Sequence, residues 1–197
     1  MNPEQITPET HSADALPDRI RLDSRYDAER LRRDVHAIVS SLTQPFYIYY
    51  SPIPLAINVK IPPAHDWAAE PMLRGCPYLQ EIFREFKTEI TSIRLMRLEA
   101  GAVLKEHTDP TLDAVHREVV RLTLPVFSDD LVRFLLNGTE VPMKPGELWY
   151  MRLSELHSVH NNSPNERINM SIDLMWNEWL EKWLASNVIP DGRLHDS

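Results

Sequence analysis

Apolar residues recur at helical spacing near the start of the chain. They stand at intervals of four, three and four residues, which is the spacing of one face of an α-helix, and Asp27 precedes them as a candidate N-cap. The apolar face consists of Leu31, Val35, Ile38 and Leu42. The charged positions of the same segment are predicted to face solvent, and they are Glu29, Arg30, Arg32, Arg33 and Asp34.

Two later segments show the same helical spacing. Pro77 can begin the first of them, because the N–H that proline lacks has no partner in the first turn of a helix. The apolar side of this second helix would consist of Leu79, Phe83, Phe86 and Ile90. The third helix is aromatic and is predicted to pack on the core through Trp176, Trp179, Leu180 and Trp183.

Between the second and third predicted helices, the pattern changes to short strands separated by turns. Asn137-Gly138 is typical of a type I′ hairpin, and Lys144-Pro145-Gly146-Glu147 is typical of a type II turn. Regular short strands with turn residues between them favour a jelly roll or cupin-like double sheet. The predicted strands are 92–99, 103–107, 117–126, 131–136, 138–143, 147–153, 156–160 and 167–174.

The first part of the chain adds less regular elements. Residues 46–50 and 55–61 are predicted strands, with a break at 51–54 where two prolines stand. Residues 1–18 are polar, show no periodicity and are predicted to form a mobile arm. We therefore predict a mostly β protein with flanking helices, a double-stranded β-helix of the jelly-roll, cupin-like type. Residues 19–197 would form one domain, with helix and strand elements over 19–90, a β core over 91–175 and the C-terminal helix over 176–186.

Composition narrows the classes of function. A formal net charge of −8 argues against nucleic acid and against an anionic membrane surface as partners. The single cysteine, Cys76, allows no intrachain disulfide and is interpreted as a small apolar residue in a reducing compartment. No apolar run approaches the ~18 residues of a membrane span, and the start of the chain lacks the basic and apolar regions of a signal peptide. We expect a cytoplasmic protein.

Two histidines and an aspartate form a candidate metal site. His107 and Asp109 are two residues apart, so on a strand they would point to the same face. His157, from a neighbouring strand, would supply a second imidazole. Two His and one carboxylate leave three positions open on an octahedral metal, which is typical of non-heme Fe(II) oxygenases. His160 stands three residues after His157 and would face the opposite side of the strand.

Two arginines within strand-like runs are candidate carboxylate-binding groups. Arg167 follows His157 by ten residues and can hold a carboxylate as a bidentate fork near the metal. Arg121 lies inside the apolar run 119–126, where a buried cation is costly without an anionic partner. It either pairs with an internal Asp or Glu or receives an anionic ligand, and we favour the ligand.

These residues stand in motifs that resemble the aspartyl/asparaginyl β-hydroxylase family of Fe(II)- and 2-oxoglutarate-dependent dioxygenases. Within it, the resemblance is greatest to bacterial enzymes that hydroxylate free amino acids, such as L-proline cis-4-hydroxylase. The vertebrate aspartyl hydroxylases have Gly where this chain has Asp109. The motifs are His107-Thr108-Asp109-Pro110, the run 119–126, Pro145-Gly146-Glu147-Leu148-Trp149, His157-Ser158-Val159-His160-Asn161 and Arg167.

The resemblance implies a role for each candidate residue. His107, Asp109 and His157 would hold Fe(II), with 2-oxoglutarate and O2 at the open positions. Arg167 would bind the 5-carboxylate of 2-oxoglutarate, and Arg121 would meet 2-oxoglutarate or the substrate. Arg94, thirteen residues before His107, resembles an arginine near the substrate carboxylate in free-amino-acid hydroxylases. The alternative for Arg94 is a salt bridge at the rim.

The expected reaction is the hydroxylation of a free amino acid or a small amino-acid derivative, with release of succinate and CO2. One alternative is a hydroxylase of Asp, Asn or another residue in a peptide or carrier-bound substrate. Another is a non-redox, cupin-like metabolite-binding protein, which would not consume 2-oxoglutarate in air with added Fe(II).

Overall fold

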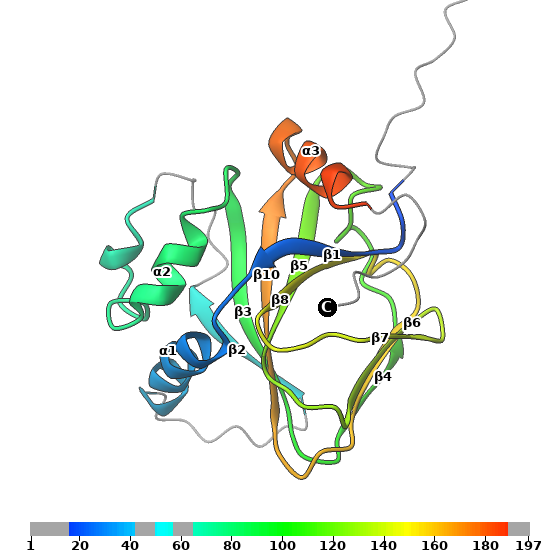
Figure 1. Ribbon diagram of the computed structural model, residues 1–197, viewed down its shortest axis with the longest axis horizontal. Helices are drawn as coiled ribbons and strands as arrows, with labels where there is room; N and C mark the ends of the chain where they lie inside the picture. Colours follow the sequence, from blue (N-terminus) through cyan, green and yellow to red (C-terminus); the bar gives the residue numbers. More distant parts are fainter. Residues whose placement is uncertain (1–15, 42–49, 57–64, 189–197) are drawn as a thin grey trace, which may run out of the picture.

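The computed structural model describes residues 16–41, 50–56 and 65–188. The strands in these ranges form two antiparallel sheets (Figure 1). The larger sheet has the order β1-β8-β5-β10-β3-β2, and the smaller sheet has the order β4-β9-β6-β7. Their bounds are β1 (Arg19–Arg25), β2 (Tyr50–Ala56), β3 (Ile90–Leu98), β4 (Val103–His107), β5 (Val119–Phe127), β6 (Val132–Leu136), β7 (Thr139–Val141), β8 (Glu147–Met151), β9 (His157–Asn161) and β10 (Arg167–Met175).

The helices in the described ranges lie around the larger sheet. In Figure 1, α1 and α2 lie on the side of the molecule where β2 and β3 run, and α3 lies beyond the end of β10. Buried side chains of α1, α2 and α3 belong to one hydrophobic cluster with the larger sheet. The helices are α1 (Ala28–Ser41), the short 3-10 helix η2 (Trp67–Ala69), α2 (Pro77–Phe83) and α3 (Glu178–Ser186).

Strand β10 shows how the larger sheet separates core from pocket. Successive side chains of a strand point to opposite faces. The even-numbered residues are apolar and pack in the core beneath the helices, where burial stabilises each by about 1.5–3 kcal/mol. The alternate residues are polar and also buried, so they must find partners on the opposite face. The apolar set is Ile168, Met170, Ile172 and Leu174, and the polar set is Arg167, Asn169, Ser171 and Asp173.

The neighbouring strands repeat this division. On β5, Leu122 and Leu124 join the core beneath the helices, while Arg121 and Thr123 face the other way. On β3, Leu95 joins the same core. The inner face of the larger sheet therefore carries a patch of buried polar side chains contributed by the adjacent strands β5 and β10.

Two predicted turns have the expected backbone geometry. Asn137 and Gly138 both have positive φ angles, 51° and 71°, as a type I′ hairpin requires. Gly146 has a φ of 84°, as the third residue of a type II turn requires. A Cβ at Gly146 would lie 2.2 Å from the carbonyl oxygen of Tyr26, so this turn accepts no other residue without displacement of the backbone.

The strand predictions from residue 92 onward are confirmed to within about three residues at each end, but the N-terminal predictions need correction. The break predicted at 51–54 is wrong, because β2 runs through it. Strand β2 is at the edge of its sheet, where a proline has no ladder partner to lose on its outer side. Strand β1 was not predicted; it pairs antiparallel with β8. The rest of the two predicted strands, 46–49 and 57–61, lies outside the described residues.

The predictions for α1 and α2 are confirmed in position. Phe83 ends α2, so the predicted apolar face was too long: Phe86 and Ile90 are buried, but they lie after the helix. Cys76 is a buried residue at the start of α2, and burial raises the pKa of its thiol to about 11. Leu42 and most of the arm predicted for 1–18 lie outside the described residues. The single domain predicted for 19–197 stays a prediction.

Asp34 is buried, which corrects its assignment to the solvated face of α1. It stands three residues after Leu31 and four before Ile38, so it shares their face of the helix. Its Oδ2 accepts hydrogen bonds from the backbone N–H groups of Tyr78 and Leu79, at 2.9 and 3.1 Å. Asp34 thus satisfies the first turn of α2, whose own N-cap residue makes no such bond.

Asp34→Ala is expected to lower the free energy of unfolding by about 1–3 kcal/mol, because two N–H groups lose their acceptor in a buried setting. Urea denaturation measures the change. Glu29→Ala is the matched control, since Glu29 is an exposed acid on the same helix, and we expect a change of about 0.5 kcal/mol or less. Equal effects of the two substitutions would contradict the capping role.

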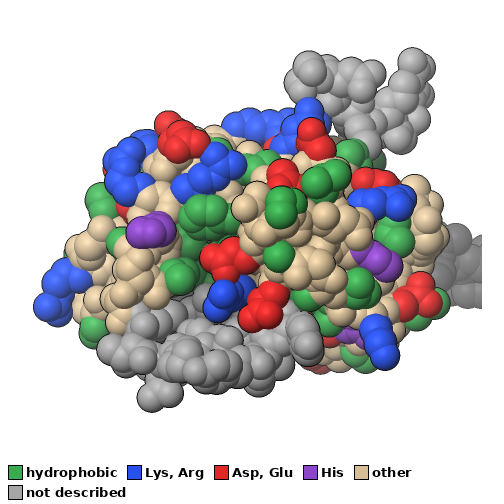
Figure 2. Space-filling model, turned by 90° about the horizontal axis from the view of Figure 1, so that it is seen from below, with side chains coloured by type: hydrophobic (Ala, Val, Ile, Leu, Met, Phe, Trp, Pro, Cys, Tyr) green, Lys and Arg blue, Asp and Glu red, His purple; other side chains and the backbone are tan. Residues whose placement is uncertain are grey.

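None of the helices in the described ranges is long and apolar enough to cross a membrane. On the face of the molecule in Figure 2, Lys and Arg side chains are interspersed with Asp and Glu side chains. Positive charge is not gathered into one patch there.

Candidate functional site

A pocket lies between the two sheets, and both contribute to its walls. It encloses about 450 Å³ of free space, part of it open to solvent. The larger sheet contributes mainly polar side chains from its inner face, and the smaller sheet contributes both histidines together with apolar residues. The lining residues are Met96, Leu104, His107, Asp109, Arg121, Thr123, Phe134, Leu153, His157, Val159, Arg167, Asn169 and Ser171.

The two predicted imidazoles meet because of the register of β4 and β9. His107 is the last residue of β4 and His157 the first of β9, and the two are directly opposite each other in the antiparallel pair. Their ring centroids are 4.2 Å apart. Asp109 joins them, and the ligand atoms of all three residues lie within 4.8 Å of one another. The structure therefore brings together the three residues that the sequence proposed as a metal site.

Backbone carbonyls fix the orientation of both rings. Nδ1 of His107 is 2.8 Å from the carbonyl oxygen of Lys105, and Nδ1 of His157 is 2.9 Å from that of Glu155. A carbonyl only accepts, so each Nδ1 must carry a proton, and Nε2 is the ring nitrogen through which each histidine would bind a metal. Burial lowers the pKa of His157 below its usual value, which favours the neutral ring that binds metals.

Asp109 lies two residues beyond the end of β4. The prediction that it shares a strand face with His107 therefore does not explain its position. Its backbone N–H instead donates to the carbonyl oxygen of Leu153, at 2.7 Å, which holds the loop against the pocket. Its Oδ2 accepts a hydrogen bond from Nη1 of Arg121 at 3.2 Å.

Arg121 has an internal carboxylate partner, the arrangement that the sequence left as the alternative to an anionic ligand. Asp173 is directly opposite Arg121 in the β5–β10 pair. Its Oδ1 accepts from Nε of Arg121 at 2.7 Å, and its Oδ2 accepts from Nη2 at 2.9 Å. Arg94 adds an ion pair, with its Nη2 at 3.4 Å from Oδ2 of Asp173. Four charged side chains are thus linked in the order Arg94, Asp173, Arg121, Asp109.

Asp173 was missed as a site residue. The sequence did contain a signal for it. Asp173 is an acid inside the strand-like run 167–175, and it is six residues after Arg167, so both would point to the same face of a strand. Its pairing with Arg121 needs the register between β5 and β10, which the sequence did not provide.

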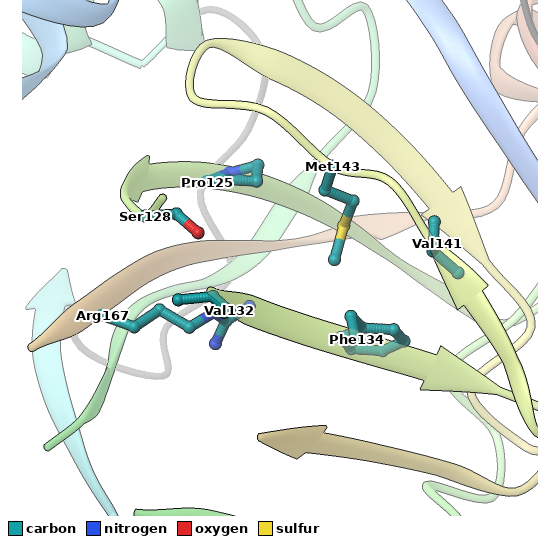
Figure 3. A pocket seen from close by; sticks show the side chains of 7 residues that line it. All are labelled: Pro125, Ser128, Val132, Phe134, Val141, Met143 and Arg167. Carbon is teal, nitrogen blue, oxygen red and sulfur yellow. The ribbon is translucent and has the colours of Figure 1, made fainter. Parts of the chain in front are cut away.

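Arg167 is buried and begins β10, as predicted, on the same face as Asn169 and Ser171. It lines the main pocket and also a smaller adjoining cavity (Figure 3). Its guanidinium therefore lies at the end of the pocket that borders this cavity. The cavity is otherwise lined by Pro125, Ser128, Val132, Phe134, Val141 and Met143.

The donor atoms fit an Fe(II) ion with 2-oxoglutarate. Two imidazoles and one carboxylate suit a non-heme iron that keeps open positions. Asn169 has a buried amide oxygen, Oδ1, without a hydrogen-bond partner, although it lines the pocket. Leaving a buried polar atom without a partner costs free energy. If the side-chain amide of Asn169 is rotated by 180°, its N–H groups take the place of the oxygen and can donate to a carboxylate of a bound ligand. The polar side chains of β10 that line the pocket are thus suited to contact with a polar ligand.

Other histidines lie outside this group. His160 is part-buried on β9, pairs across the sheet with Val103 and Arg133, and does not line the pocket. His65 is bonded to Glu70 at 2.7 Å.

Several solved structures share this fold. An oxidoreductase of the 2OG-Fe(II) oxygenase family from Burkholderia pseudomallei is 14% identical, with 79% of this chain and 83% of that chain covered and a TM-score of 0.53. A viral collagen prolyl hydroxylase from Paramecium bursaria Chlorella virus-1, in a 2OG complex, is 12% identical, with 85% and 100% covered and a TM-score of 0.54. The predicted double-stranded β-helix is confirmed.

Two sequence comparisons bear on the family of this chain. The sequence matches none of the curated proteins. It does match the family model described as Aspartyl/Asparaginyl beta-hydroxylase over residues 63–177, which is more than half of the chain and includes every proposed site residue. The chain therefore belongs to the aspartyl/asparaginyl β-hydroxylase family and is a dioxygenase that uses Fe(II), 2-oxoglutarate and O2.

Proposed function

We propose that this enzyme hydroxylates a free amino acid or a small amino-acid derivative, while 2-oxoglutarate is converted to succinate and CO2. The observation that carries the proposal is the placement of three arginines on one face of the larger sheet: Arg121 and Arg167 line the pocket, and Arg94, on the next strand, is linked to Arg121 through Asp173. One anionic cosubstrate needs only one arginine to bind its carboxylate with two parallel hydrogen bonds. Further guanidinium groups at the same site suit a substrate with its own carboxylate.

We assign Fe(II) to His107, Asp109 and His157. The Nε2 atoms of the two imidazoles and one carboxylate oxygen would supply three ligands, which would leave three positions for 2-oxoglutarate and O2. When bound, the iron supplies the activation of O2 that oxidation of an unactivated C–H bond requires. The Phe134 ring, stacked on His157 with an interplanar angle of 8°, restricts the rotation of that imidazole.

We assign the 5-carboxylate of 2-oxoglutarate to Arg167, which is 5% exposed at the end of the pocket. A guanidinium presents two parallel N–H donors that match a carboxylate. Arg121 lies beside the metal ligands, with Nη1 bonded to Asp109, and we assign it to the cosubstrate or the substrate.

We assign the substrate carboxylate to Arg94, together with Arg121. The Arg94 side chain is 29% exposed, and its contact with Asp173, at 3.4 Å, is longer than any of the Arg121 contacts. Arg94 is therefore the more exposed of the two cations that pair with Asp173, and it is the one we assign to an incoming carboxylate. A residue inside a peptide has no α-carboxylate for Arg94 to bind.

A panel of free amino acids incubated with the enzyme, Fe(II) and 2-oxoglutarate in air tests the proposal. We expect one or a few of them to gain one oxygen atom by mass spectrometry, with one succinate formed per product. The matched control is the same amino acid blocked as its amide or N-acetyl derivative, which we expect to react poorly. Hydroxylation of blocked or peptidyl forms alone would assign the enzyme to peptide or carrier-bound substrates.

A further inference from the structure

Asp173 is a buried carboxylate that uses both of its oxygens. Its side chain is 3% exposed, and it forms a two-bond fork with Nε and Nη2 of Arg121, at 2.7 and 2.9 Å. Bidentate pairs of this kind are strong and also fix geometry, because both partners are planar. The plane and direction of the Arg121 guanidinium are therefore set from β10.

The remaining edge of the guanidinium faces the metal site. With Nε and Nη2 held by Asp173, Nη1 reaches Oδ2 of Asp109 with a single bond of 3.2 Å. A single bond to one oxygen leaves the other oxygen of Asp109 for a metal. A guanidinium released from Asp173 could instead form its own fork with Asp109 and take both oxygens.

We propose that Asp173 is a positioning residue for the metal site: it holds Arg121 so that Arg121 binds only one oxygen of Asp109. This inference rests on the proposed function, in which Asp109 is a metal ligand. Asp173 touches neither the metal ligands nor the proposed ligand positions directly, and it acts through Arg121. Partners of metal ligands commonly change metal affinity by about 10–100-fold when they are removed.

The charges of Arg94, Asp173, Arg121 and Asp109 also support a positioning role for Asp173. Two aspartates and two arginines balance one another around the buried pair of Asp173 and Arg121, so each guanidinium has a carboxylate close by. Removal of Asp173 breaks the two-bond fork that fixes the Arg121 guanidinium and keeps its ion pair with Asp109. Arg121 then competes with the metal for Asp109.

The test is the binding of Co(II), an oxygen-stable probe, measured in the absence of 2-oxoglutarate by titration and by its visible absorption. Asp173→Asn is expected to raise the Kd of Co(II) by about 10–100-fold in the otherwise natural chain. In an Arg121→Gln background, the same substitution is expected to change the Kd by less than about threefold, because the group through which Asp173 acts is gone. The double variant removes both charges of the pair, so it leaves no buried charge without a partner. It can therefore still be measured if Asp173→Asn alone folds poorly.

Two further variants separate positioning from charge alone. Asp173→Glu keeps the charge but moves the carboxylate by one methylene, and we expect it to weaken Co(II) binding as Asp173→Asn does. Glu140→Gln breaks an exposed ion pair with Arg133 on the smaller sheet and is the control, with an unchanged Kd.

Equal effects of Asp173→Asn in both backgrounds, or none in either, would overturn the inference, as would a natural affinity in Asp173→Glu. A failure of the proposed metal site looks different. The natural chain would then bind Co(II) no better than the His157→Ala variant.

Discussion

His157→Ala is expected to abolish Fe(II)-dependent turnover, while His160→Ala, three residues along the same strand, keeps most of it. His157 lines the pocket and presents Nε2 beside His107 and Asp109, whereas His160 lies outside the pocket lining. Loss of a hydrogen-bonding partner of a metal ligand already costs about 10–100-fold, and loss of the ligand itself should cost more. Consumption of 2-oxoglutarate and anaerobic Fe(II) binding measure the effect.

The other two proposed ligands extend this expectation. His107→Ala should resemble His157→Ala, because the two rings occupy equivalent places opposite each other. Asp109→Ala should also lose turnover, since it removes a ligand and leaves the Arg121 cation facing the metal without that carboxylate. Loss of Fe(II) binding in His160→Ala, with binding kept in His157→Ala, would show that the ligand on β9 had been assigned to the wrong histidine.

One part of the proposed metal site, the choice between the two histidines of β9, could be made from the sequence because its signal is local. His157 and His160 are three residues apart, so alternation along a strand places them on opposite faces, and β9 has that geometry. The same alternation correctly placed Arg167, Asn169 and Ser171 on one face of β10. A motif that lies within one strand needs no knowledge of the partner strand.

The Arg121–Asp173 pair could not be predicted in the same way. The two residues are 52 positions apart, and they meet because β5 and β10 are neighbours in one particular register. A shift of one residue would turn Asp173 to the opposite face. The sequence therefore indicated that Arg121 needed an anion, but not which anion, and the choice between an internal carboxylate and a ligand required the fold.

The errors near the N-terminus have a related cause. Asp34 was assigned to solvent because it is charged, although its spacing from Leu31 and Ile38 places it on the buried face. Its partners, the N–H groups at the start of α2, are 44 and 45 residues away in sequence. For β2, the two prolines were interpreted as a break because the edge position of the strand, which tolerates them, was not known.

Arg167→Ala is expected to raise the apparent KM for 2-oxoglutarate by roughly a hundred- to several-thousand-fold. Removing one partner of a buried, hydrogen-bonded charge pair costs about 3–5 kcal/mol, and each ~1.4 kcal/mol is a factor of ten in affinity. Arg167 is buried at the end of the pocket, so water cannot readily replace its guanidinium. Initial rates over a range of 2-oxoglutarate concentrations measure the change.

Three comparisons define the role of Arg167 more sharply. Arg167→Lys should recover only part of the loss, because an ammonium is a point charge and cannot reproduce the two-bond fork. Arg94→Ala should show the reverse pattern, with a small effect on the KM for 2-oxoglutarate and a large one on the KM for the amino-acid substrate. Arg133→Ala, an exposed arginine on β6, is the control that should change neither.

The distinction between the cosubstrate and substrate arginines depends on saturating one ligand while the other is varied. At saturating 2-oxoglutarate, the KM for the substrate should change little in Arg167→Ala, because the proposal assigns Arg167 to the 5-carboxylate of the cosubstrate and a different arginine, Arg94, to the substrate. If Arg167→Ala left the KM for 2-oxoglutarate unchanged and Arg121→Ala raised it, the cosubstrate would be anchored from β5. The roles of these two arginines would then have to be exchanged, with Asp173 orienting the fork that holds 2-oxoglutarate.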